Sequence, residues 1–312
     1  MDSMESMNQT EPRESRKQPA PLGAAEIRTV AVLGAGTMGG GIAHVFARSG
    51  YQVILRDVSP EVLNRAQTTI SANLDREVKK GKVAADAKSA ILARIHATTD
   101  SARLAEADFA VEAVPERLEL KRAVLGEADR ILRPHVILAS NTSSISIATL
   151  AAATFRADRF VGMHFMNPVP VMELVEVVRA PQTSDSALAT TMELARSLGK
   201  TPVAVNDAPG FVANRVLMPM INEATFAVME GVATPEAVDA VMRTGMNHPM
   251  GPLELADLIG IDVCVDILDV LEAGFPNSKE CSKYAACPLL RKMVAEGRLG
   301  RKSGRGFYEY NA

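Results

Sequence analysis

The chain has 312 residues, of which 47% are hydrophobic and 23% are charged, and its formal net charge at pH 7 is −3. This length suggests two domains, since one domain usually takes about 100–200 residues. The near-neutral charge argues against a protein whose main partner is nucleic acid, because phosphate binding needs clustered Lys and Arg. No stretch approaches the ~18–20 consecutive apolar residues that span a bilayer, so no membrane segment is expected.

The first 26 residues mix Ser, Pro, Glu and Arg without an apolar run, so we expect a disordered tail over 1–26. The tail lacks the apolar centre of a secretory signal, and its acidic residues are unlike a mitochondrial presequence, which indicates the cytoplasm. The three cysteines fit no C-x-x-C spacing, and no pair of the five histidines fits H-E-x-x-H. We therefore expect free thiols in a reducing compartment and no metal site.

From Ile27 the chain alternates short apolar runs with helical patterns. This alternation predicts an α/β fold with a Rossmann-type, doubly wound and mainly parallel sheet, covered by helices on both faces. Helices are expected over 61–80 and near 186–198, the second capped by Ser184. Strands are expected at 29–33, 52–55, 109–113, 136–139 and 160–164, with further extended pieces at 172–178 and 202–205.

After Asn206 the pattern becomes helical only. Apolar residues at helical spacing predict one long helix over 211–231, kinked at Pro219. Thr234 and Pro235 form a cap and first-turn pair that opens the next helix, and further helices are expected over 253–271 and 289–296. A boundary near residue 207 therefore separates an α/β domain, 27–206, from a smaller all-α domain, 207–312.

A glycine-rich G-x-G-x-x-G motif follows the first expected strand and opens a helix, and Asp57 ends the second expected strand. Such glycines permit a tight turn, the helix N-terminal amides bind a pyrophosphate, and the carboxylate binds ribose hydroxyls. The motif predicts a dinucleotide site in which Asp57 favours NAD, although the neighbouring Arg56 is of the type that accommodates the 2′-phosphate of NADP. The motif residues are Gly34, Ala35, Gly36, Thr37, Met38 and Gly39.

A nicotinamide enzyme that oxidises an alcohol needs a base for the hydroxyl proton. His164 is the candidate, because it ends an expected strand at the carboxyl edge, where open α/β sheets bind ligands; a structural histidine is the alternative. A carboxylate against its second ring nitrogen would orient it, and both Glu173 and Glu176 follow nearby. Their odd separation puts them on opposite faces of a strand, so only one faces His164, and the sequence leaves the choice open.

The polar segment SNTSS, residues 140–144, follows another expected strand at the same edge. Its hydroxyl and amide groups can hold a substrate oxygen or the nicotinamide carboxamide. Alternatively, Ser144 caps an expected helix over 145–152 while Ser143 serves chemistry. Asn214, near the start of the long apolar helix, indicates either a hydrogen bond between the domains or a substrate contact.

Six segments resemble, in order and spacing, the L-3-hydroxyacyl-CoA dehydrogenase family and especially its short bacterial 3-hydroxybutyryl-CoA branch, over about 27–310. The segments are GAGTMGGGIA, SNTSS, GMHFMNPVPVMELVEVV, APGFVANR, NHPMGPLELADLIG and GRKSGRGFYEY. The resemblance implies reversible, NAD-dependent oxidation of an L-3-hydroxyacyl-CoA to a 3-oxoacyl-CoA, in fatty acid or butanoate metabolism. It implies that His164 is the base, that Glu176 orients it, and that Ser143 and Asn214 hold the reacting oxygen.

The resemblance also implies the residues that bind cofactor and substrate. The NAD contacts would be the glycine motif with Asp57, Glu116, Lys121, Ser143, Asn167 and Lys302. The CoA contacts would be Asn73, Lys80 and Ser143, although Lys80 is equally a charge on a solvated basic face. The chain departs from the family pattern at three positions: Met166 where an aromatic residue is common, Arg117 where Asn is frequent, and Asn73 where some members have Ser.

The apolar helices of the second domain, together with the resemblance, imply a homodimer. Two rival functions remain from the sequence. A free hydroxyacid or sugar-acid dehydrogenase of the same architecture would have no use for Lys80. A non-catalytic relative, such as a lens crystallin, would need none of the group His164, Glu176, Ser143 and Asn214.

Overall fold

The computed structural model describes residues 20–275 and 281–310. Residues 1–19 of the expected tail lie outside these ranges, but residues 20–26 differ from the expectation. A short 3₁₀ helix, η1 (Ala24–Glu26), packs beside α6 (Asp185–Ser197), and Leu22 packs against the apolar cluster of the sheet. The Thr190 hydroxyl donates to Leu22 O at 3.3 Å. The first domain therefore begins before residue 27, because Leu22 finds apolar contacts far away in the sequence.

An eight-stranded sheet forms this first domain, in the spatial order β3-β2-β1-β4-β5-β6-β7-β8. Neighbouring strands are parallel except for β6 and β7, which are antiparallel. The carboxyl ends of the first six strands therefore meet at one edge, as the doubly wound fold predicts. The strands are β1 (Thr29–Leu33), β2 (Gln52–Arg56), β3 (Ile95–Thr98), β4 (Phe109–Glu112), β5 (Ile137–Ser140), β6 (Phe160–Phe165), β7 (Leu174–Arg179) and β8 (Thr201–Asn206).

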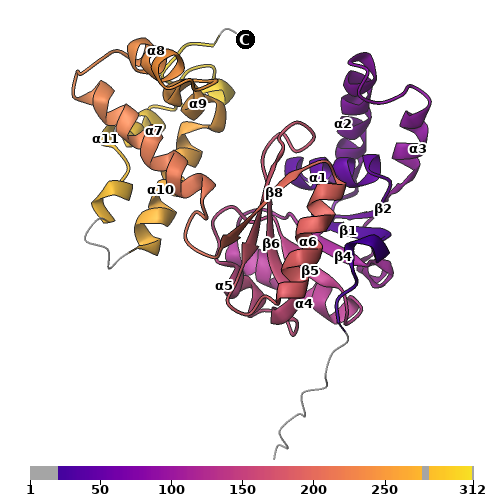
Figure 1. The fold of residues 1–312 in the computed structure, drawn as a ribbon. Coiled ribbons are helices and arrows are strands. Elements are labelled where there is room, and N and C mark those ends of the chain that lie inside the picture. The colour runs from indigo at the N-terminus through magenta and orange to yellow at the C-terminus, as the bar shows by residue number, and fades with distance from the viewer. Residues whose placement is uncertain (1–19, 276–280, 311–312) are drawn as a thin grey trace, which may run out of the picture.

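Helices cover both faces of the sheet, each with its own apolar cluster. One face packs against α1 (Thr37–Arg48), α2 (Pro60–Lys79) and α6, and the other packs against α4 (Leu118–Ile131) and α5 (Ile147–Ala151). In Figure 1, α2 and α3 (Ala87–Ala93) extend away from the sheet. Side chains of a strand alternate between faces, and in β6 Val161 and Met163 face α1 while Phe160 faces α5. His164 therefore lies on the α5 face.

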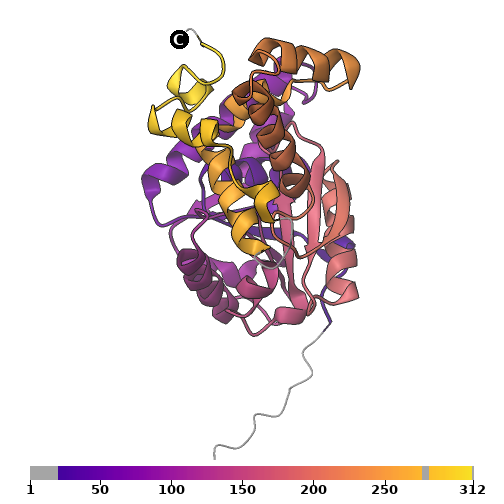
Figure 2. The same ribbon diagram turned by 90° about the vertical axis from the view of Figure 1, so that its left-hand side faces the viewer.

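The second domain is helical and has a separate apolar cluster that includes Met218, Ile221, Leu268 and Leu290. It stands to one side of the sheet in Figure 1, and in Figure 2 it lies in front of the sheet and extends above it. None of the helices within the described ranges combines the length and apolar character needed to cross a membrane. The helices are α7 (Ala213–Met229), α8 (Pro235–Gly245), α9 (Pro252–Ile259), α10 (Ile261–Gly274) and α11 (Pro288–Ala295), with 3₁₀ turns η2 (Ser101–Glu106), η3 (Ala157–Arg159), η4 (Cys281–Tyr284) and η5 (Arg301–Ser303) in the two domains.

Three local expectations differ from the structure. The single helix expected over 253–271 is two helices, since Gly260 adopts φ 107°, which a helix does not permit. The short strand β3, which follows α3 and includes His96, was not expected. The cap of α5 is Ser146, which accepts from Thr149 N at 3.3 Å, rather than Ser144, whose hydroxyl binds Glu116 instead.

A buried ion pair supports the end of α4. Arg156 and Asp129 are 4% and 8% exposed, and Arg156 Nε lies 2.5 Å from Asp129 Oδ1. The other guanidinium nitrogens donate to four main-chain carbonyls near the end of α4, at Asp129, Leu132, Arg133 and Val136. Asp129 O lies in the last turn of α4, where carbonyls lack intrahelical partners, and the other three carbonyls lie in the segment that follows the helix, so this one side chain joins the two.

Replacing Arg156 with Met is therefore expected to lower the free energy of unfolding by about 3–5 kcal/mol, since it leaves the Asp129 charge buried and unpaired. Urea denaturation at pH 7, followed by circular dichroism, measures this loss. The control is Arg122→Met on the same helix, whose exposed pair with Glu119 spans 3.1 Å and should contribute at most about 1 kcal/mol. Equal losses for the two variants would contradict the assignment.

Candidate active site

The antiparallel pair β6–β7 brings a histidine and a glutamate together. His164 is the register partner of Glu176, and His164 Nδ1 lies 2.8 Å from Glu176 Oε2. Both residues are buried, at 7% and 2% exposure. Glu173, the other candidate, precedes β7 and is exposed. The structure thus places Glu176, and not Glu173, against the imidazole.

The second oxygen of Glu176 reaches the other domain. Glu176 Oε1 accepts hydrogen bonds from Val212 N at 3.1 Å and Ala213 N at 2.9 Å, where α7 begins. Burial raises the pKa of Glu176, but the hydrogen bonds from His164 and from these two amides outweigh it, so the pKa lies below its usual value. An ionised carboxylate accepts the Nδ1 proton of His164, which leaves Nε2 with a lone pair for a substrate.

Phe211 and Asn214 complete the junction between the domains. The Phe211 ring meets the imidazole of His164 edge-on, with ring centroids 5.8 Å apart. Phe211 has a left-handed backbone, with φ 48°, which is rare for a bulky residue. Asn214 Nδ2 donates to Ser143 O at 3.2 Å. Of the two alternatives for Asn214, the structure shows the hydrogen bond between the domains.

The segment that follows β5 is gathered around Glu116. Glu116 Oε1 accepts from Thr142 Oγ1 at 2.6 Å, from the amides of Ser143 and Ser144 at 2.9 and 3.0 Å, and from their two hydroxyls at 3.3 and 2.9 Å. Burial raises the pKa of Glu116, but the charge of Lys121 and these hydrogen bonds outweigh it and lower the pKa. A single carboxylate oxygen therefore holds Ser143 in place.

Lys121 is paired inside the protein rather than exposed. It is 1% exposed, and its Nζ lies 2.7 Å from Glu112 Oε1 and 3.2 Å from Glu116 Oε2. Sequence reasoning missed Glu112, which is fully buried and also accepts from Ser140 Oγ at 2.6 Å. The sequence feature that could have identified Glu112 is its place at the end of the apolar strand FAVE, at the carboxyl edge of the sheet.

The glycine motif forms a cradle that fits a dinucleotide. A Cβ on Gly39 would lie 1.8 Å from Gly34 O, and Gly34 itself has φ 99°, so the turn requires glycine at both positions. Nothing lies within 4 Å of a Cβ built on Gly36, the cap of α1, and no side chain caps that helix end. The amides of the first turn, which includes Thr37 and Met38, are therefore open to a pyrophosphate.

Asp57 closes this cradle at the end of β2. Its Oδ2 accepts from Ala35 N at 2.8 Å and its Oδ1 from Ser59 N at 3.1 Å. The neighbouring Arg56 extends to the other side, where its guanidinium lies 3.8 Å from Glu127 Oε1. Each carboxylate oxygen accepts one main-chain hydrogen bond and keeps a further lone pair beside the glycine turn, which fits ribose hydroxyls and thus NAD.

Four other expected site residues have no contact with the His164 cluster among the described residues. Lys302 lies on η5, with its Nζ 2.6 Å from Asp262 Oδ2. Asn73 and Lys80 lie on or at the end of α2, and Asn73 Oδ1 accepts from Arg76 at 2.8 Å. Asn167 is exposed just after β6. Lys302 therefore lies in the second domain, Asn73 and Lys80 lie along the helix that follows β2, and Asn167 lies in the loop that follows β6.

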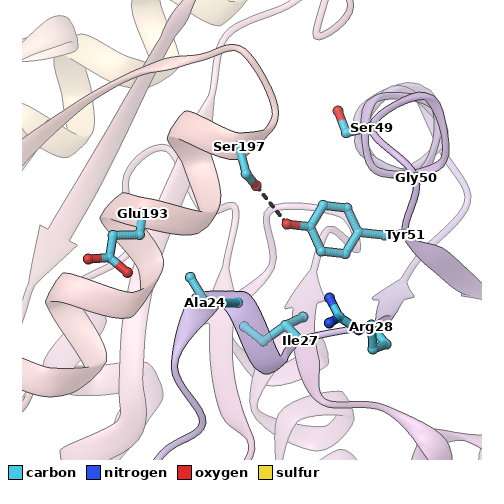
Figure 3. A pocket seen from close by; sticks show the side chains of 9 residues that line it. Ala24, Ile27, Arg28, Ser49, Gly50, Tyr51, Glu193 and Ser197 are labelled. Carbon is cyan, nitrogen blue, oxygen red and sulfur yellow. Dashed lines mark hydrogen bonds between the residues drawn. The ribbon is translucent and has the colours of Figure 1, made fainter.

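A hollow of about 430 Å³ lies elsewhere, at the amino end of β1 and β2 (Figure 3). Its lining includes Arg28, Glu193 and the hydrogen-bonded pair Tyr51 Oη and Ser197 Oγ, 2.7 Å apart. His164 and the glycine motif lie at the opposite edge of the sheet, so this hollow is separate from them. Within residues 20–275 and 281–310, no three His, Cys, Asp or Glu side chains are grouped as metal ligands.

Comparison with known proteins agrees with this geometry. Residues 29–208 match the NAD-binding domain of 3-hydroxyacyl-CoA dehydrogenase, and residues 210–310 match the C-terminal domain of the same enzyme family. A probable 3-hydroxybutyryl-CoA dehydrogenase of Deinococcus radiodurans is 53% identical over 89% of this chain and 99% of its own length. A 3-hydroxybutyryl-CoA dehydrogenase of Bradyrhizobium diazoefficiens is 50% identical over 92% and 97%.

A solved structure extends the similarity to the fold. The (S)-3-hydroxybutyryl-CoA dehydrogenase of Ralstonia eutropha superposes with a TM-score of 0.88 at 49% identity, covering 92% of this chain and 100% of that one. The two family matches together span both domains in order. The chain therefore belongs to the 3-hydroxyacyl-CoA dehydrogenase family and is an NAD-dependent oxidoreductase.

Proposed function

We propose that this chain oxidises (S)-3-hydroxybutyryl-CoA to acetoacetyl-CoA with NAD, and that it also catalyses the reverse reduction. The observation that carries the proposal is the buried pair His164–Glu176, with an Nδ1 to Oε2 distance of 2.8 Å, at the sheet edge that also holds the glycine motif. Relatives about half identical to this chain over most of its length bear that substrate in their names. A role in fatty acid or butanoate metabolism and a cytoplasmic location stay predictions from the sequence.

In this proposal His164 is the base. Its Nε2 removes the proton of the 3-hydroxyl group, and NAD held along the glycine motif would supply the hydride acceptor for C3. The Glu176 carboxylate fixes the tautomer through the Nδ1 proton and stabilises the imidazolium that forms. The low pKa of Glu176 supports this role, because it keeps the carboxylate charged at the moment the ring gains a proton.

Ser143 and Asn214 hold the reacting oxygen in this proposal. The Ser143 hydroxyl donates a long hydrogen bond of 3.3 Å to Glu116. Asn214 donates one of its two amide hydrogens to Ser143 O. Asn214 therefore keeps a second amide hydrogen for a substrate oxygen, and the Ser143 hydroxyl can turn its one hydrogen from Glu116 to that oxygen. Since Asn214 comes from the second domain, we propose that the substrate lies between the domains, with their boundary near residue 207.

Two sets of residues bind the cofactor and the CoA portion in this proposal. NAD lies along the glycine motif, with Asp57, Glu116, Lys121, Ser143, Asn167 and Lys302 around it. CoA lies beside α2, where Asn73 and the exposed Lys80 are two helical turns apart and so lie on one side of the helix. The local charge of Lys80 would meet the CoA phosphates on a protein whose overall charge is −3.

Oxidation of NADH, followed at its absorbance, tests the proposed substrate. We expect efficient turnover with acetoacetyl-CoA and at least about 10²-fold lower kcat/KM with free acetoacetate, because remote CoA contacts contribute binding energy to the reacting centre. Equal efficiency with free acetoacetate would favour the rival hydroxyacid dehydrogenase. If the protein binds NADH but reduces neither acetoacetyl-CoA nor free acetoacetate, the result would favour the rival reading as a non-catalytic relative.

We also propose that the chain forms a homodimer through the second domain. Several large apolar side chains of that domain are exposed, as an unpaired contact surface would be: Val216 66%, Val232 74%, Val241 60%, Met246 61% and Leu258 50%. Light scattering at micromolar concentration should give twice the 33.3 kDa of one chain. A mass that stays at one chain over this range would contradict the dimer.

A further inference from the structure

Lys200 is a buried lysine that plays no part in the site described above. It lies between Gly199 and β8 and is 7% exposed. Its Nζ donates to Val169 O at 2.5 Å and to Met172 O at 2.7 Å. Burial lowers the pKa of Lys200, and the positive charge of Arg48 lowers it further. Burying an ammonium group is costly unless its hydrogens are satisfied, and the two carbonyls satisfy two of its three hydrogens here.

Both carbonyls belong to the loop, residues 166–173, that joins β6 to β7. The adjoining strands carry His164 and Glu176, so the loop closes the hairpin on which both are mounted. The loop has few hydrogen bonds of its own, since Pro168 and Pro170 have no N–H to donate. Val171 N and Met172 N both donate to a single carbonyl, that of Pro168, at 3.0 Å. Lys200 therefore adds two hydrogen bonds between this loop and the rest of the domain, beside the main-chain bond from Thr201 N to Glu173 O at 2.9 Å.

The loop also packs closely against α1. Val169 is 2% exposed, and a Cβ on Gly41 of α1 would lie only 2.9 Å from Val169 Cβ. The loop is thus held both by Lys200 and by the helix that follows the glycine motif. Asn167, the proposed NAD contact, comes two residues before Val169, so any shift of the loop changes its distance from the bound cofactor.

We propose that Lys200 is a positioning residue of the reaction, whose ammonium holds the β6–β7 loop against α1 so that Asn167 meets NAD and His164 faces the substrate. The inference rests on the proposed function for the roles of Asn167 and His164. Lys200 itself touches neither cofactor nor substrate and acts through the loop. A displacement of about 1 Å at a reacting centre can cost about 10²-fold in rate, so loss of this anchor has a measurable effect.

Lys200→Met tests the proposal, because it keeps the aliphatic stem and removes the donors. We expect kcat for reduction of acetoacetyl-CoA to fall by about 10- to 10²-fold and the Kd for NADH, measured by its fluorescence, to rise several-fold. KM for acetoacetyl-CoA should change little, since Asn73 and Lys80 lie on α2. Lys200→Arg, which restores donors to the carbonyls, should recover part of both losses. The control is Lys292→Met, whose side chain is 69% exposed.

A folded Lys200→Met variant with wild-type kcat and wild-type NADH affinity would overturn the proposal. If that variant does not fold, Gly41→Ala displaces Val169 from α1 while Lys200 stays intact. A raised NADH Kd and a lowered kcat in Gly41→Ala support the proposal, and unchanged values overturn it. If wild type fails to reduce acetoacetyl-CoA, the proposed function is wrong, whereas the NADH affinities of wild type and Lys200→Met still decide the role of the loop.

Discussion

Replacing His164 with glutamine is expected to lower kcat for acetoacetyl-CoA reduction by about 10²–10⁴-fold, the usual contribution of a positioned acid or base. Glutamine has similar reach and can still hydrogen-bond to Glu176, but it cannot exchange a proton near neutral pH. The Kd for NADH should stay near the wild-type value, because none of the atoms in the glycine cradle contacts His164. Stopped-flow or steady-state NADH oxidation measures kcat, and NADH fluorescence measures the affinity.

The matched control is His96→Gln. His96 is exposed on β3, where its Nε2 lies 3.3 Å from Gln52 Oε1, and it has no contact with the candidate site. We expect wild-type kcat for this variant. Near-normal turnover in His164→Gln would show that another group carries the proton, whatever the result with His96.

Glu176→Gln is expected to reduce kcat by up to about 10⁴-fold, as found when an orienting carboxylate is replaced by an amide. The amide oxygen can still accept from Ala213 N, in which case the NH₂ group faces Nδ1 of His164. An NH₂ donor there requires Nδ1 to be the acceptor, which moves the ring proton to Nε2. The histidine then presents a donor to the substrate hydroxyl and cannot act as its base.

Glu173→Gln on the same hairpin provides the comparison. Glu173 is exposed and lies outside β7, so its replacement should leave kcat unchanged. NADH affinity should be close to wild type in both variants. A large loss of NADH affinity in Glu176→Gln, with kcat retained at saturating NADH, would instead assign Glu176 to the cofactor site.

The glycine motif and the doubly wound sheet could be predicted from the sequence because both depend on local patterns. The turn needs glycine at Gly34 and Gly39 for steric reasons that involve neighbouring backbone, and strand and helix periodicities lie within short segments. The second domain was predicted as helical for the same reason. Its break at Gly260 was missed, because a glycine within an apolar helical pattern can be tolerated or can end the helix.

The choice between Glu173 and Glu176 could not be made from alternation along the chain. Alternation tells which residues share a face of one strand, but the partner of His164 depends on how two strands align. The antiparallel register that sets His164 opposite Glu176 is a property of the pair, fixed by the loop between them. The buried ion pair between Glu112 and Lys121 could not be predicted from the sequence either, since the two residues lie on different elements.

Through Glu176, the chemistry of the site depends on how closely the start of α7 approaches the first domain. One oxygen binds the imidazole of the first domain, and the other binds two amides at the start of α7 in the second. Those amides help to keep the pKa of Glu176 low, so drawing α7 away would raise it and weaken the charge that stabilises the imidazolium. A small molecule bound between Glu176 and the start of α7 would then inhibit the enzyme without competing with NAD.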